Sequence, residues 1–496
     1  MEQKEIMDIE EAIETLQISK PTFYRWLKSG RIKGTKVGRQ WRFYTKDIER
    51  LLKGEGPEIK IKGDLGPILD QLESYIGKHT DKKLNMSHIN CDLLEKLCLL
   101  TVVAANFVDA TDIHLSSTID DIGQGPIGVI RFRIQGMLKT IVTFEHDQVQ
   151  GIIEKWMSLS QCDLHQKLLP QDGRIQYNLS EILTSLPNKK IDFLISFTPS
   201  YYGIALTARL LNVNIMLDRM NIENFGFDPQ NVKRIKQAIN LSYGLILVSS
   251  PPSHGKTTLM LSLLKEIAGP SMKIASIENP IEVVIPWATQ TQINKTHGLD
   301  YVNGLRSIMR TDPDVIMVSE FDDSDKLVEM GIDIANSGHL LIGTFQCQCV
   351  LDSLEKILAL FSSKRGIIAE GIKMIISQRL IRKLCPHCKQ KYRPTKTQID
   401  QLTEHGPIPA KLIESTPFYR PKGCPKCVDG YQGRFALEEV LTVTSKVKDA
   451  ILKDKHFDNL ILKKLDPCFK TFLIRGSENA AQGKTSLDEL IRCLNL

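Results

Sequence analysis

The chain has 496 residues, a formal net charge of +6, 42% apolar residues and 25% charged residues. These proportions are those of an ordinary globular protein, and the length predicts three or four domains. The polar, acidic start of the chain argues against a signal peptide, and no run of 18 apolar residues could span a membrane. We therefore expect a cytoplasmic protein that lies at the inner membrane only through partners.

The basic charge is concentrated near the N-terminus. Residues 20–50 contain ten Lys or Arg against two acidic residues, a local charge of +8, so the rest of the chain carries −2 (6 − 8). A basic cluster of this kind favours a polyanionic partner.

Residues 7–52 are predicted to form a small winged helix-turn-helix. Ser19 can cap the second helix, which Gly30 ends, and a hairpin over residues 33–44 precedes a closing helix over 45–52. The helix and hairpin offer six candidate DNA contacts: Thr22, Arg25, Lys28, Lys36, Arg39 and Arg42.

This segment resembles the excisionase and MerR-type DNA-binding domain, notably in SKPTFYRWLKSG (residues 19–30) followed by KVGRQWRF (residues 36–43). The resemblance implies that the second helix enters the major groove of double-stranded DNA, while the hairpin contacts phosphate or the minor groove. The alternative is a docking domain that keeps the fold and uses its charge on an acidic protein or a membrane surface.

The remaining chain is predicted to contain an α+β domain followed by an α/β core in which strands and helices alternate. Residues 366–384 are predicted to be a helix that runs into the first cysteine pair. The expected boundaries are a linker at 53–67, the α+β domain at 68–225, a RecA-like P-loop core at 226–380, a tetracysteine zinc-binding segment at 381–436 and a C-terminal helical segment at 437–496.

A phosphate-binding loop follows the buried strand predicted for Leu245 to Val248. It ends in Gly255-Lys256-Thr257 and opens a helix, so that backbone N–H groups and the positive end of the helix dipole point at phosphates. Lys256 would reach the outer phosphates of ATP, and the Thr257 hydroxyl would bind Mg²⁺. The expected cradle of amides comprises Ser253, His254, Gly255, Lys256, Thr257 and Thr258.

The loop departs from the usual glycine-rich pattern. Ser250 stands where the pattern has glycine, Ser253 occupies another position that is usually glycine, and Pro251 and Pro252 have no N–H to donate. A lone Gly-Lys-Thr could also be a solvated helix start. The flanking strand, and a second buried strand over Val315 to Val318, favour nucleotide binding.

An acidic residue follows that second strand. Glu320 lies just past its end, at the edge where ligands bind in open α/β sheets.

Two C-x-x-C pairs, separated by 35 residues, predict one structural zinc ion. In a chain without an export signal, such pairs indicate metal binding rather than a disulfide. Four thiolates give the closed tetrahedral shell of structural zinc. The alternatives are two unrelated turns with free thiols, or a redox pair. The expected ligands are Cys385, Cys388, Cys424 and Cys427.

Taken in order, the motifs resemble those of the secretion ATPases that power type II secretion and type IV pilus assembly, from about residue 104 to the C-terminus. The segments that carry this resemblance are Asp112-Ile113-His114, RFRIQG (131–136), LPQDGR (169–174), SIENPIE (276–282), residues 310–320, Ser337-Gly338-His339, residues 378–388 with 423–434, and TSLDE (485–489).

The resemblance implies ATP hydrolysis by a homo-hexamer that drives a membrane platform partner. In that family's chemistry, Glu320 would polarise the attacking water, Glu278 would support magnesium or that water, and His339 would sense the γ-phosphate. The nucleotide would sit between the core and the preceding domain. That domain would contribute four arginines: Arg131, Arg133, Arg174 and Arg209.

Four positions depart from the family pattern. Asp322 replaces an arginine, Gln346 a histidine, Leu194 a nucleotide-facing arginine and Ile204 a glutamate. Arginines that neutralise a transferring phosphoryl group are worth about 10³–10⁵ in rate, so turnover could be slow or regulatory. The alternatives are a DNA-binding regulatory protein, or an inactive scaffold subunit, built on a degenerate secretion ATPase.

Overall fold

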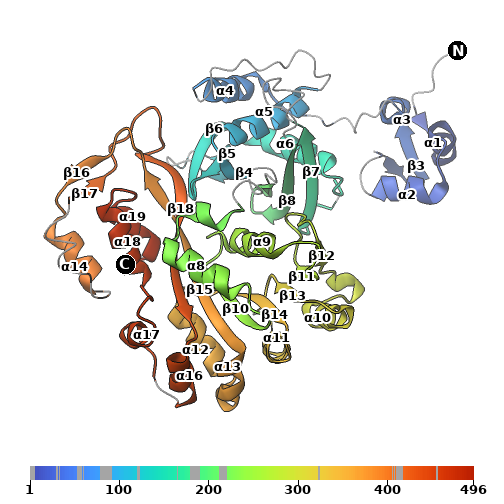
Figure 1. The fold of residues 1–496 in the computed structure, drawn as a ribbon. Coiled ribbons are helices and arrows are strands. Elements are labelled where there is room, and N and C mark those ends of the chain that lie inside the picture. Colours follow the sequence, from blue (N-terminus) through green and yellow to red (C-terminus); the bar gives the residue numbers. More distant parts are fainter. Residues whose placement is uncertain are drawn as a thin grey trace. The chain divides into compact units, whose positions relative to one another are not determined.

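The structure is a computed structural model (Figure 1). It divides into two compact units, Met1–Ile215 and Met216–Leu496. Within the described residues, no helix is both long and apolar enough to cross a membrane. The described residues are 6–28, 32, 34–38, 40–52, 59, 61–78, 92–119, 123, 125–164, 166–178, 190–211, 220–321, 324–404, 406, 408, 417–453 and 456–496.

The N-terminal module has the order of elements predicted for a winged helix-turn-helix. Its elements are β1 (Ile6–Met7), α1 (Ile9–Leu16), α2 (Lys20–Lys28), β2 (Thr35–Val37), β3 (Gln40–Tyr44) and α3 (Thr45–Leu52). Phe23 of α2 packs edge-on against Phe43 of β3, with ring centroids 5.2 Å apart. Both rings are fully buried, so they join the helices to the small β1-β3-β2 sheet.

The rest of the first unit is a six-stranded antiparallel sheet with helices packed on it. The strand order is β6-β5-β4-β9-β8-β7. Phe132 of the sheet contacts Tyr75, and Phe193 contacts Trp156, so the helices cover one face. The elements are α4 (Gly66–Gly77), α5 (Leu93–Phe107), β4 (Ala110–Ile119), β5 (Pro126–Ile134), β6 (Met137–Glu145), α6 (His146–Leu159), β7 (Gln171–Asn178), β8 (Lys190–Ser200) and β9 (Gly203–Leu211).

The second unit is built on a seven-stranded sheet of order β12-β11-β13-β14-β10-β15-β18. Only the last pair, β15 with β18, is antiparallel. The predicted α/β core is therefore confirmed. The strands are β10 (Gly244–Ser249), β11 (Ile274–Glu278), β12 (Ala288–Gln292), β13 (Val315–Val318), β14 (Leu340–Phe345), β15 (Ile372–Leu384) and β18 (Tyr431–Thr442).

Helices cover both faces of this sheet, which explains why its central strands read as continuous apolar runs. Leu245 and Leu247 join a core with six helices, while α8 (Pro229–Ala238) and α9 (Lys256–Ile267) contact β15 and β10. The six helices are α10 (Tyr301–Ile308), α11 (Asp325–Asn336), α12 (Val350–Leu360), α13 (Arg365–Gly371), α16 (Ser445–Leu452) and α17 (Asn459–Leu465).

A separate apolar cluster joins β15 and β18 to the end of the chain. The elements around it are β16 (Gln390–Tyr392), α14 (Lys396–Glu404), β17 (Phe418–Arg420), α18 (Phe472–Ala481) and α19 (Leu487–Leu494).

The helix predicted for residues 366–384 is wrong. A short helix, α13, ends at Gly371, and the rest is the 13-residue strand β15. Apolar residues three and four positions apart, such as Ile372, Ile376 and Leu380, imitate a helical period. The strand lacks an alternating pattern because helices bury both faces of its first half. The expected domain boundary after residue 380 therefore falls inside one strand of the core sheet.

Candidate functional site

The predicted phosphate loop connects the end of β10 to the start of α9. Gly255 immediately precedes the helix with φ +84°, and Ser253 has φ +63°, both in the left-handed region. Lys256 and Thr257 form the first turn of α9 and are half-buried. The loop and helix start thus bring together the six residues predicted to cradle phosphates, at the amino end of a 12-residue helix.

The loop is bound to the neighbouring strand β15 through His254. The Leu380 N–H donates to His254 Nδ1 at 3.0 Å, and the Gln378 side-chain amide donates to the His254 carbonyl at 2.7 Å. Burial, followed by the charges of Arg379, Arg434 and Arg492, lowers the pKa of His254 to about 4. His254 is therefore neutral at physiological pH.

The strand order gathers the predicted acidic residues at the same edge of the sheet. β14 lies between β10 and β13, and β11 lies beyond β13, all parallel. Parallel strands end at a common edge, so Glu278 at the end of β11 and Glu320 two residues past β13 lie at the phosphate-loop edge.

Glu278 is the most constrained of these acids. Its side chain is buried, and Oε1 accepts hydrogen bonds from the Ser276 hydroxyl at 2.7 Å and from the Gln290 amide at 2.8 Å. Burial raises the pKa of Glu278, while the two hydrogen bonds oppose that shift. Glu320 is half-buried at its strand end.

The γ-phosphate contact of His339 stays a prediction, and in the structure His339 lies at the sheet edge opposite the phosphate loop of its own chain. The His339 carbonyl accepts from Gly244 N–H at 3.0 Å, at the start of β10. The loop leaves from the other end of that strand, after Ser249. Five residue steps at about 3.3 Å separate the two edges by roughly 17 Å.

From the sequence, Gln346 was noted only as the residue that replaces a histidine of the family pattern. It directly follows β14, which lies between the strands that lead to the phosphate loop and to Glu320. Its side chain is exposed. The signal was available, because Gln346 is the first polar residue after the fully buried run of residues 340–345.

In the first unit, the predicted arginines lie on the sheet face opposite the helices. Asp112 of β4 pairs in register with Arg133 of β5 and with Arg209 of β9. Its carboxylate accepts from Arg209 Nε at 3.0 Å and lies 3.8 Å from Arg133 Nε. Arg174 of β7 donates to Asp192 at 3.0 Å.

Arg131 and Leu194 lie on this same face of the sheet. Arg131 pairs in register with His114, two residues along from the row that holds Asp112. Leu194 sits in register between Arg209 and Arg174, so an apolar side chain interrupts the row of arginines. Ile204, by contrast, is buried in the core of the domain.

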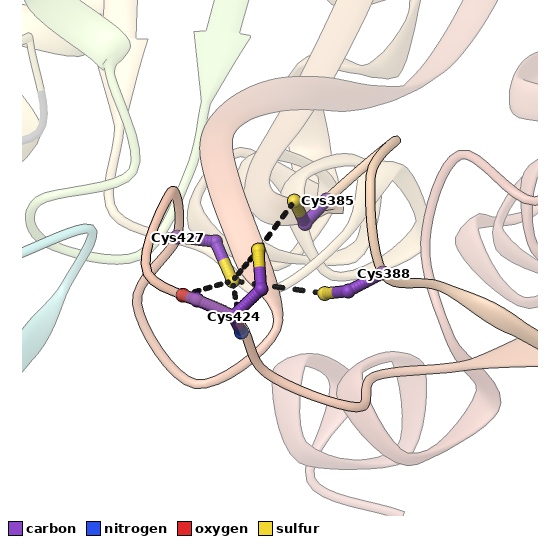
Figure 2. Close-up of side chains that lie close together, drawn as sticks. All are labelled: Cys385, Cys388, Cys424 and Cys427. Carbon is purple, nitrogen blue, oxygen red and sulfur yellow. Dashed lines mark hydrogen bonds between the residues drawn. The ribbon is translucent and has the colours of Figure 1, made fainter.

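The four predicted zinc ligands come together at the ends of two paired strands (Figure 2). Cys385 directly follows β15, and Cys424 and Cys427 lie in the turn before β18. The Sγ atoms of Cys385 and Cys424 are 3.8 Å apart, those of Cys388 and Cys427 3.7 Å, and those of Cys424 and Cys427 3.5 Å.

These distances fit one tetrahedral ion rather than disulfides. A Zn–S bond of about 2.3 Å in a tetrahedron implies sulfur–sulfur distances of about 3.8 Å, whereas a disulfide brings its sulfurs to about 2.05 Å. All four sulfurs lie within 4.8 Å of one another. The donor set therefore suits a structural zinc ion.

The helix-turn-helix residues are divided between α2 and the hairpin. Arg25 and Lys36 are exposed, and Thr22 and Arg42 are half-buried. Arg42 donates to the Gln40 side chain at 2.6 Å. Arg39 and the side chain of Lys28 lie outside the described residues. So does Asp322, the residue of the second unit that replaces a family arginine.

Comparison with known proteins decides the family. The family model described as "Type II/IV secretion system protein" matches residues 90–492. The chain belongs to this family. A model described as "Helix-turn-helix domain" matches residues 6–56.

Curated relatives agree with this assignment. The chain is 32% identical over 384 residues to the type IV pilus assembly ATPase PilB of Thermus thermophilus; the match covers 77% of this chain but only 41% of that protein. It is 30% identical to the putative type II secretion system protein E of Escherichia coli, over 77% of this chain and 73% of that protein.

Solved structures share the fold of this chain. The Legionella pneumophila ATPase DotB matches 84% of this chain and 100% of its own with a TM-score of 0.56 and 16% identity. The pilus retraction motor PilT, solved with bound ADP, matches 82% of this chain and 97% of its own, with a TM-score of 0.54 and 19% identity.

Proposed function

We propose that the protein binds and hydrolyses ATP at the phosphate loop of its second unit, as a cytoplasmic motor of the type II secretion and type IV pilus class. The observation that carries the proposal is the convergence of the loop after β10, Glu278 and Glu320 at one edge of a single parallel sheet. That edge is where open α/β sheets bind ligands.

The residues present fit a nucleoside triphosphate with magnesium. Amides 253–258 and Lys256 would hold the phosphates, and Thr257 would hold Mg²⁺. Glu320 would orient the attacking water and accept its proton, and Glu278 would support the metal or that water. Phosphoryl transfer needs little more from a protein than positioning and neutralisation of charge.

Four arginines of the first unit are the further residues proposed to bind ATP. Arg131, Arg133, Arg174 and Arg209 share one face of a sheet, whose opposite face packs on helices. A hexamer would supply the rigid frame for closure on ATP, and an inner-membrane platform or other secretion component would receive the motion. Leu194 and Asp322, where the family has arginine, favour slow turnover.

A zinc ion at the four cysteines would be structural. It would close the connection between β15 and β18 and supply folding energy to the C-terminal segment.

Steady-state ATP hydrolysis by the purified full chain tests the proposal. Replacing Glu320→Gln should leave ATP binding intact and lower the rate at least about hundredfold, because the amide cannot accept the proton of water. Glu355→Gln, an exposed residue of α12, is the control that should hydrolyse normally. Equal rates for the wild type and Glu320→Gln would mean that Glu320 is not catalytic or that the activity is a contaminant.

A second function is proposed for the N-terminal module, which matches a helix-turn-helix model and exposes Arg25 and Lys36. We propose that it binds double-stranded DNA, with α2 in the major groove. The alternatives are a docking domain and an inactive regulatory or scaffold role for the whole chain.

Selection of the full chain against a random duplex library tests this second function. Arg25→Ala should change the preferred sequence if the side chain reads a base edge. Lys36→Ala should weaken all sequences alike and reduce the salt dependence if it contacts phosphate. Recovery of no enriched sequence after several rounds would favour the docking domain.

A further inference from the structure

The phosphate loop begins where one strand loses its neighbour. β10 and β15 pair in register up to Ser249 and Ser377, whose hydroxyl groups hydrogen-bond at 3.0 Å. β10 then ends, but β15 continues for seven more residues to Leu384. On its other edge β15 stays paired with β18. The edge that faces the loop is left with backbone groups that need partners.

His254 supplies the missing partner. Its ring Nδ1 accepts from the Leu380 backbone N–H, as a strand carbonyl would have done. Its own backbone carbonyl accepts from the side-chain amide of Gln378. We call these two hydrogen bonds the His254 clasp. Because Nδ1 accepts, the ring proton must be on Nε2 and the ring must be neutral. The low pKa of His254 keeps it neutral at physiological pH.

The loop needs such a restraint because its backbone is strained. Ser253 adopts φ +63°, a region that non-glycine residues avoid. Gly255 adopts φ +84°, and a Cβ there would lie 2.7 Å from the Gln378 side-chain nitrogen. Gln378 is fully buried, and its Oε1 has no hydrogen-bond partner. β15 is therefore packed against the very residues that would cradle phosphates.

We propose that His254 is a positioning residue that holds the phosphate loop in its nucleotide-accepting shape before nucleotide binds. The inference rests on the proposed ATP binding and adds to it a residue whose type the phosphate-loop pattern does not specify. A preformed cradle avoids the cost of ordering the loop on binding. The clasp should therefore act on the affinity for ATP and ADP alike, with little effect on the chemical step.

Two substitutions in the full chain separate the clasp from simple packing. His254→Leu puts an apolar side chain of similar length in place of the ring and so removes the acceptor. His254→Asn keeps an acceptor oxygen at the position of Nδ1. We expect His254→Leu to weaken the Kd for a fluorescent ADP analogue and the KM for ATP by about tenfold, as for one lost buried hydrogen bond with its unpaired donor. His254→Asn should stay within about twofold of the wild type, and kcat should change less than about twofold in both.

His297→Leu, an exposed histidine of the same unit, is the matched control and should bind normally. Gln378→Met removes the other bond of the clasp and should weaken binding in the same direction, which keeps the test open if His254→Leu folds poorly. Zinc content and thermal unfolding report the folding of each variant.

Wild-type affinity in His254→Leu, or equal weakness in His254→Leu and His254→Asn, would overturn the proposal. So would a fall in kcat at unchanged affinity. A wild-type chain that bound no nucleotide would instead overturn the proposed function. Hydrogen exchange distinguishes the two failures, because the Leu380 amide should be protected in the wild type whether or not nucleotide binds, and rapid exchange there would overturn the clasp alone.

Discussion

Gln290 donates a 2.8 Å hydrogen bond to the carboxylate of Glu278 and a 2.9 Å hydrogen bond to the carbonyl of Val283. Its side-chain oxygen accepts from the Ile285 N–H at 2.7 Å. One side chain thus ties the buried acid at the end of β11 to the loop that follows it. The orientation of Glu278 depends on a residue of the neighbouring strand β12.

Replacing Gln290→Leu should lower kcat about tenfold and leave nucleotide affinity nearly unchanged. The hydrogen bond from Gln290 holds down a pKa that burial raises, so its loss should raise the pKa of Glu278 further. The acid limb of the kcat–pH profile should then move to higher pH. Gln292→Leu is the control, because Gln292 contacts Ile281 N–H instead. An unmoved acid limb would remove Glu278 from the catalytic set.

Replacing Lys256→Ala should weaken nucleotide binding strongly. The ammonium group lies in the first turn of α9, beside the amides expected to hold phosphate. Hydrogen bonds to charged groups are worth about 1.5–3 kcal/mol, so affinity should fall about tenfold to hundredfold or more. Lys265→Ala, an exposed lysine in the last turn of the same helix, is the matched control. Calorimetric titration with ATP measures both, and full-strength binding by Lys256→Ala would contradict the phosphate-loop assignment.

Metal analysis of protein purified without chelator should find one zinc per chain. Cys385→Ser should lose that zinc and lower the temperature at which the second unit unfolds, because bound structural zinc contributes folding free energy. Cys468→Ser should keep both, since Cys468 lies outside the four-cysteine cluster. Zinc-free protein with normal stability would refute the site.

Acid should destabilise the wild type more than His254→Asn. The pKa of His254 is lowered from 6.5 to about 4 in the folded chain, so between these values the unfolded chain binds more protons than the folded one. The stability from neutral His254 is therefore fully present above pH 6.5 and is lost as pH falls toward 4. Denaturant unfolding at pH 8 and pH 5 measures it, and parallel losses in both proteins would contradict the shift.

Much of the core could be predicted because its strands have a clear local sequence pattern. The buried runs that became β10 and β13, and the polar residues directly after them, place Lys256 and Glu320 from sequence alone. The cysteine spacing likewise predicted a cluster across a gap of 35 residues. These features depend on short-range pattern and on general rules for parallel sheets.

Other features depended on strand pairing, which no local pattern carries. His339 lies before its strand rather than after it, and the register with Gly244 shows that this is the edge opposite the phosphate loop. The contacts of His254 join residues 124 and 126 positions apart. The strand nature of residues 372–384 was hidden because both faces are buried in its first half, so apolar residues are not confined to alternate positions.

Asp112 gives the arginine face of the first unit a different character from a bare cationic patch. Arg133 and Arg209 share its carboxylate, and Arg174 has Asp192. An arriving anion must compete with these resident carboxylates, so it exchanges partners instead of neutralising isolated charges. Such a face should bind singly charged anions weakly. Its affinity should rise for a ligand whose negative charge exceeds that of a carboxylate. Without its ligand, the protein should therefore leave this face unoccupied by the small anions of the solution.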